Sequence, residues 1–192
     1  AQQLGHHHFQ LLNRHDRVKA CVLALELQVK DALGYATHLF STWFCADALS
    51  ELERLCKHSD RRVRSTARAL LITCYQATLP RLRVETLGGF KVFRGESPIE
   101  EHEWKRSQPK DLLKLIVAHG VRKIPKEILM EDLWPETDPD VAANNFKVTL
   151  HRLRKVLEPT MIKSMGSSYI HLKDNNVFLE TDRFDVDSLE FQ

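Results

Sequence analysis

The sequence predicts a mainly α-helical protein with small antiparallel sheets, and two spacings of apolar residues predict it. Across residues 9–77, and again across 107–158, apolar residues recur every three or four positions, which places them on one face of a helix. Across 82–93 and 168–180, apolar and polar residues alternate, as in a strand with one buried face. We therefore expect a helical first region, followed by short strands on either side of a second group of helices.

The composition is that of a globular protein. The chain has 192 residues, of which 43% are hydrophobic and 28% charged, enough for one or two domains with hydrophobic cores. It has neither an apolar run near the ~18 residues that a membrane span needs nor a signal-peptide pattern at its start, so we expect a cytoplasmic protein that does not contact a membrane. The scattered cysteines favour free thiols over disulfides or zinc; they are Cys21, Cys45, Cys56 and Cys74.

The first domain is expected to be an α-helical region over 1–79, either a bundle or a fragment of a helical repeat. Its apolar stripes are broad and rich in alanine, which suits closely packed helical hairpins. The predicted helices are 17–33, 39–56 and 61–77, the last capped by Ser59 or Asp60. Basic residues between 54 and 68 favour a solvated face, with an auxiliary nucleic-acid contact as the alternative.

The second domain is expected over 80–182 and begins with a strand meander. Two alternating segments flank Gly88-Gly89, and a short third strand begins at Pro98-Ile99. Helices are predicted at 107–119, capped by Ser107, at 126–133, and at 138–158. Strands at 168–172 and 177–180, joined by the four residues 173–176, then predict a hairpin. Three helices followed by a hairpin are typical of a winged helix, which lays its last helix in the major groove of DNA.

The predicted helix at 138–158 has two different faces. Asp138 is expected to cap it, and its apolar stripe is Ala142, Phe146, Leu150, Leu153 and Leu157. The opposite face carries Asn144, Asn145, Lys147, Val148, His151, Arg152 and Lys155. Amides and cations of this kind hydrogen-bond to base edges and phosphates, and Val148 suits a thymine methyl group. A solvated basic face is the alternative for such a helix.

Charge is segregated along this domain. Residues 104–126 contain seven Lys or Arg and one acid, whereas 127–140 contain six acids and no base. Because duplex DNA attracts basic segments and repels acidic ones, we expect the acidic block to face away from DNA.

Three segments carry a family resemblance: LRVETLGGFKVFRGESPI, WKRSQPKDLLKLIVAHG and KEILMEDLWPETDPDVAANNFKVTLHRLRKVLEP. Together they resemble the OmpR/PhoB-type winged helix-turn-helix, and more closely its version in SARP-type bacterial transcriptional activators, over about 81–182. The resemblance implies sequence-specific binding to double-stranded promoter DNA, by a protein that is a monomer alone or a dimer on DNA repeats. It implies groove reading by Asn144, Asn145, Lys147, Val148, His151 and Arg152. It also implies that Arg154 and Lys155 serve the helix and nearby phosphates, and that a hairpin tip at Lys173, Asn175 and Asn176 approaches the adjacent minor groove or backbone.

The resemblance also implies a polymerase contact and a longer protein. In the family, the loop before the recognition helix contacts RNA polymerase, which here implies Trp134, Glu136, Thr137 and Asp138; for Trp134, a role in the core is the alternative. Residues 183–192 resemble the start of the activation domain that follows in SARP-type proteins, so we expect a truncated activation domain there. Family hairpins often end in Gly-Tyr-Arg, but this chain has Asn176-Val177-Phe178-Leu179, which implies little minor-groove reading.

Two other classes of function were weighed. A winged helix is sometimes used as a protein–protein interaction module in a larger signalling protein, although such a helix more often exposes aromatic residues or leucine. An enzyme is not expected, because the sequence lacks a nucleophile–base set, paired carboxylates on one face and a glycine-rich phosphate loop. For the same reason we expect neither a cofactor nor a metal.

Overall fold

The structure is a computed structural model that describes residues 46–120, 123–162 and 165–189, together with residues 20, 23, 24, 27 and 34. The chain divides into two compact units, residues 1–79 and 80–192. The predicted helix at 17–33 lies almost entirely outside the described residues, as do the start of that at 39–56 and the thiols of Cys21 and Cys45.

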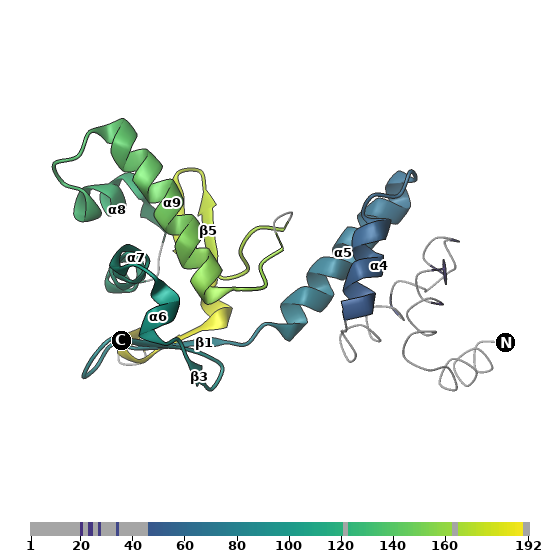
Figure 1. Cartoon of the computed structure of the whole chain (residues 1–192), viewed down its shortest axis with the longest axis horizontal. Coiled ribbons are helices and arrows are strands. Elements are labelled where there is room, and N and C mark those ends of the chain that lie inside the picture. Colours follow the sequence, from purple (N-terminus) through teal and green to yellow (C-terminus); the bar gives the residue numbers. More distant parts are fainter. Residues whose placement is uncertain are drawn as a thin grey trace. The chain divides into compact units, whose positions relative to one another are not determined.

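In the first unit, α4 (Ala46–Leu55) and α5 (Arg61–Thr78) pack side by side (Figure 1). Of the two predicted caps, Asp60 is the one that begins α5, because its carboxylate accepts a hydrogen bond from the backbone N–H of Arg62 at 2.7 Å. Leu52 and Leu55 of α4 are fully buried. The buried residues of α5 are Val63, Ala67, Leu70, Leu71, Cys74 and Tyr75. Cys74 is a free thiol, as predicted, and burial raises its pKa to about 11.

The second unit opens with the predicted meander of β1 (Leu82–Glu85), β2 (Lys91–Arg94) and β3 (Ser97–Pro98). The strands are antiparallel neighbours, and Val84 of β1 lies opposite Val92 of β2 with both side chains buried. The turn between β1 and β2 needs positive φ at Gly88 (+79°), which a residue without Cβ adopts at little cost. The third strand begins one residue earlier than predicted.

The prediction of purely antiparallel sheets is wrong for this sheet. Strand β7 (Phe184–Val186) lies parallel to β1, which gives the order β3-β2-β1-β7. The short helices η1 (Thr181–Arg183) and η2 (Asp187–Leu189) flank it. The Asp187 carboxylate accepts hydrogen bonds from the backbone N–H groups of Thr86 (2.9 Å) and Leu87 (3.0 Å). Residues 184–187, expected to open a further domain, thus complete the first sheet.

The remaining elements of this unit are its helices and a second small sheet. They are α6 (Glu101–Trp104), α7 (Ser107–Ala118), α8 (Lys126–Leu133) and α9 (Pro139–Leu157), with a second sheet of β4 (Ile124–Pro125), β6 (Asn176–Leu179) and β5 (Ile170–Lys173) in that order. The three predicted helices agree within one residue, whereas α6 and β4 were not predicted. Ser107 does not cap α7: Arg106 occupies the N-cap and Ser107 is the first helical residue.

The core of the second unit lies where α7, α8 and α9 meet (Figure 1). Leu112, Leu113 and Ile116 of α7 are fully buried, as is Leu129 of α8. The predicted stripe of α9 is buried along its whole length, through Ala142, Phe146, Leu150, Leu153 and Leu157. None of the helices in the described ranges is long and apolar enough to cross a membrane.

Candidate nucleic-acid interface

The orientation of α9 follows from its cap and its buried stripe. The Asp138 carboxylate accepts hydrogen bonds from the N–H groups of Asp140 (3.0 Å) and Val141 (3.4 Å), and Pro139 occupies the first turn. Because the apolar stripe faces the core, the opposite side is outward. We call its residues the reading face: Asn144, Asn145, Lys147, Val148, His151 and Arg152. Asn145 and Arg152 are half-buried and the other four are exposed, Val148 at 39%.

The two cations at the end of α9 are bonded within the chain. Arg154 is half-buried, and its Nε donates to the backbone carbonyl of Ile170 in β5 at 3.1 Å. Desolvation lowers the pKa of Arg154, an effect that nearby Glu158 opposes. Lys155 donates from Nζ to the carbonyl of Met161 at 3.3 Å. These two residues, expected near phosphates, join α9 to the segment that follows it.

Glu158 adds a second connection between α9 and the hairpin. Its side chain is 1% exposed, and its carboxylate accepts hydrogen bonds from the backbone N–H (2.8 Å) and hydroxyl (3.2 Å) of Ser168. The next residue, Tyr169, donates its hydroxyl to the carbonyl of Pro80 at 2.6 Å, and burial raises its pKa to about 12. The start of the hairpin is therefore held both by the end of α9 and by the start of the unit.

The hairpin turns through two residues rather than the predicted four. Asp174 (φ +50°) and Asn175 (φ +60°) form the turn, and Lys173 pairs with Asn176 across it. The carbonyl of Asn175 accepts a hydrogen bond from the N–H of Lys126 at 2.8 Å, which fixes the tip against the start of α8. Lys173 and Asn175 are exposed, while the Asn176 amide donates to the Asp174 carbonyl at 2.7 Å within the turn.

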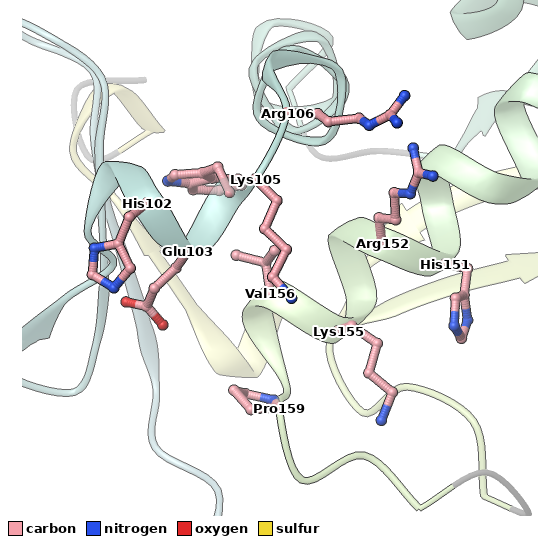
Figure 2. Close-up of a pocket in the computed structure, with 10 residues that line it drawn as sticks. His102, Glu103, Lys105, Arg106, His151, Arg152, Lys155, Val156 and Pro159 are labelled. Carbon is pink, nitrogen blue, oxygen red and sulfur yellow. The ribbon is translucent and has the colours of Figure 1, made fainter.

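Two pockets flank the reading face. The first, the α6–α9 pocket, has a volume of about 580 Å³ and is shown in Figure 2; its lining is His102, Glu103, Trp104, Lys105, Arg106, His151, Arg152, Lys155, Val156 and Pro159. The second, of about 490 Å³, lies between α8, α9 and β5 and is lined by Lys126, Met130, Ala143, Phe146, Lys147, Leu150, His151, Arg154 and Leu172. His151 lines both, so the pockets lie on either side of one ridge of α9.

Three cations in these pockets were not among the predicted site residues: Lys105, Arg106 and Lys126. The signal that could have identified them is the basic run over 104–126, from which we predicted only that this part of the domain is attracted to DNA. Their placement needs the packing of α6 and α8 against α9, and α6 is too short to show a helical period.

The loop before α9 lies at the acidic part of the domain. Trp134 is half-buried and its N–H donates to the carbonyl of Met130 at 2.8 Å, so it closes the end of α8. Thr137, also half-buried, donates its N–H to the carbonyl of Trp134 at 3.2 Å. Glu136 is exposed, and Asp138 is the cap of α9. The loop is therefore short and internally bonded, with one free-standing exposed acid.

The arrangement offers cations and amides on the outward side of α9. In residues 46–120, 123–162 and 165–189, no group of three or more His, Cys, Asp or Glu is placed to hold a metal ion. The chain matches no protein-family model, no curated protein and no solved structure.

Proposed function

We propose that residues 80–182 form an OmpR/PhoB-type winged helix that binds double-stranded promoter DNA, with the reading face of α9 in the major groove. The protein is a transcriptional regulator rather than an enzyme, and it works in the cytoplasm without a cofactor. The order of elements supports this proposal, because a strand meander, three helices and a hairpin follow one another along the chain.

One observation carries the proposal: beyond its first turn, the outward side of α9 presents amides and cations without an acid. From Asn144 to Leu157 the helix contains no Asp or Glu, and its core-facing positions are all apolar or buried. Arginine and asparagine form paired hydrogen bonds with guanine and adenine edges, whereas lysine supplies charge to phosphates. The one apolar group of the reading face, Val148, is 39% exposed and suits a thymine methyl group.

Within this proposal the protein is an activator of the SARP type. Glu136 lies in the loop that positions α9, and it is exposed beside a helix that enters the groove. Its charge repels phosphate and suits a basic surface of RNA polymerase bound at a neighbouring promoter element. DNA repeats would bring a second copy of the chain alongside the first.

The salt dependence of binding tests the proposal. The protein is titrated against a random-sequence duplex, and against a site obtained by selection from a random library, at several salt concentrations. We expect affinity to fall steeply with salt, with a log–log slope of about −0.9 for each phosphate contact. A flat salt response of the wild-type protein would refute DNA binding.

Two substitutions separate base reading from phosphate contact. Asn145→Ala should cost about 1–3 kcal/mol on the selected site and relax the preference at one base position. Lys173→Ala removes an exposed cation at the hairpin tip and should weaken selected and random duplexes by the same factor. Equal losses on both duplexes for Asn145→Ala would mean that the reading face lies elsewhere.

The alternative is a winged helix that binds another protein. It predicts that duplex DNA fails to bind at low salt while the domain remains folded, so the same titration distinguishes the two functions.

A further inference from the structure

The α6–α9 pocket has an excess of positive charge that the described part of the chain does not neutralise. Its lining includes four permanent cations, namely Lys105, Arg106, Arg152 and Lys155, and one acid, Glu103. The Lys155 ammonium is engaged by the carbonyl of Met161, but within the described part of the chain no ion pair or side-chain hydrogen bond is formed by the other three. Uncompensated cations in one pocket favour an anion there.

The single acid of the pocket is already neutralised from outside it. Glu103 forms an ion pair with Arg94 of β2 and also accepts a hydrogen bond from the backbone N–H of Glu100 at 3.0 Å. Desolvation raises the pKa of Glu103, but the hydrogen bonds from Glu100 and Arg94 outweigh it, so the net shift is downward and the carboxylate is ionised. The negative charge of Glu103 therefore neutralises Arg94 rather than the cations of the pocket.

The turn from α6 to α7 directs two of these cations toward α9. Lys105 has a left-handed backbone (φ +57°), and the N–H of Arg106 donates to the carbonyl of Trp104 at 2.6 Å. Trp104 is 3% exposed and anchors this turn in the core. Figure 2 shows Lys105 extending toward Val156, while Arg106, just before α7, and Arg152 from α9 converge. Because Lys105 has a left-handed backbone and the residues on either side of it are joined by a hydrogen bond, the turn from α6 to α7 is constrained rather than a loose surface loop.

The pocket is continuous with the reading face, because His151 and Arg152 belong to both. A duplex with α9 in its major groove carries a sugar–phosphate strand along each edge of that groove. Arginine binds phosphate oxygens in pairs and lysine adds a point charge, while the apolar wall of Val156 and Pro159 suits a deoxyribose. The chemistry of the pocket therefore fits a phosphodiester of the strand that passes between α9 and α7.

We propose that Lys105 and Arg106 form, with Arg152, a clamp for one backbone phosphate of the bound duplex. This inference rests on the proposed function. It adds a contact from the α6–α7 turn, on the side of α9 away from the hairpin. The clamp and the hairpin tip would together fix the rotation of α9 in the groove. That rotation determines which bases the reading face contacts.

The experiment compares two double variants of the whole chain. Lys105→Asn with Arg106→Gln removes both cations of the turn, and asparagine tolerates the left-handed backbone at 105. The control, Lys91→Gln with Lys114→Gln, removes the same charge from exposed residues of β2 and α7 that do not line the pocket. We expect the salt slope on random duplex to decrease in magnitude by about 0.9 for the turn variant, and to be unchanged for the control. Arg106→Gln alone, which leaves Lys105 in place, should weaken binding if the double variant does not fold.

Duplexes with neutral methylphosphonates at single positions then locate the contact. One position at the edge of the selected site should weaken wild-type binding by about tenfold, the loss of a charge-assisted hydrogen bond, and should weaken binding of the turn variant, which keeps only Arg152 of the clamp, by a smaller factor. Equal slopes for the turn and control variants would overturn the clamp. The clamp would also be overturned if the wild-type pocket binds a free mononucleotide while every methylphosphonate position weakens the wild type and the turn variant by the same factor. A wild-type protein that shows no salt-dependent duplex binding would instead refute the proposed function, and the clamp with it.

Discussion

Replacing Arg154 by methionine separates two roles for the last cations of α9. If the guanidinium joins α9 to β5, its loss removes a donor to the Ile170 carbonyl and a positive charge near buried Glu158. Methionine keeps most of the apolar stem, so the lost charged hydrogen bond dominates, at about 1.5–3 kcal/mol of unfolding free energy. At about 4 °C per kcal/mol for a domain of this size, the melting temperature should fall by roughly 6–12 °C.

The matched control is Arg152→Met, two residues away on the same helix. Arg152 lies in the reading face and lines the α6–α9 pocket, so its replacement should change stability by less than about 0.5 kcal/mol but reduce the salt slope of DNA binding by about 0.9. Thermal and urea unfolding followed by circular dichroism, beside titrations with random duplex, measure both quantities. If Arg154→Met leaves the unfolding midpoint unchanged and lowers the salt slope, Arg154 is a phosphate contact and our reasoning about the helix end is wrong.

Three further outcomes are expected. The Asp187 pKa lies below its usual 3.8, at about 2, because the Thr86 side chain and the Leu87 backbone donate to its carboxylate. Its stabilisation is therefore complete above pH ~4 and lost as the pH falls toward 2, so Asp187→Asn should reduce the acid-induced drop in melting temperature across that window. A fragment of residues 78–192, which keeps the Pro80 carbonyl that Tyr169 binds, should fold and retain the salt slope of the whole chain; circular dichroism showing an unfolded fragment would mean that the units share a core. Glu136→Lys should leave promoter affinity intact and lower transcription in vitro with purified polymerase at matched occupancy, and equal transcription would exclude this residue from the activating surface.

Local sequence rules predicted α7, α8 and α9 because each carries its own signal. In α9, an aspartate cap, a proline in the first turn and five apolar residues on one stripe agree with one another. The same residues then determine which side faces outward, so the exposure of Asn144, Lys147 and Val148 follows from the buried stripe.

Features that depend on distant parts of the chain were missed. The pairing of β7 with β1 relies on Asp187 binding the backbone of Thr86, about one hundred residues earlier, and no local pattern reports such a bond. Strand β4 has two residues, and it exists because Ile124 lies opposite Val177 of the hairpin. An element of two residues is too short to show a period of apolar and polar residues.

The role of charged residues was harder to predict than the location of helices. The family resemblance implied that Arg154 and Lys155 serve the helix and nearby phosphates. In the structure each donates to a backbone carbonyl, Arg154 to Ile170 of the hairpin and Lys155 to Met161 in the segment before it. Conversely, the sequence shows Lys105 and Arg106 only as part of a basic run and does not indicate where they lie in the fold. In the structure, the turn from α6 to α7 places both beside α9.

These bonds explain how α9 holds a defined position while its outer face stays polar. Its start is held by Asp138 and its middle by apolar packing, and its end is joined to the hairpin by Arg154 and by Glu158. The hairpin tip is in turn bonded to α8 through the Asn175 carbonyl. None of these contacts uses a residue of the reading face, so that face can be substituted without loosening the helix. If α9 binds DNA as proposed, recognition and stability depend on separate sets of residues, and variants of the reading face should report on binding rather than on folding.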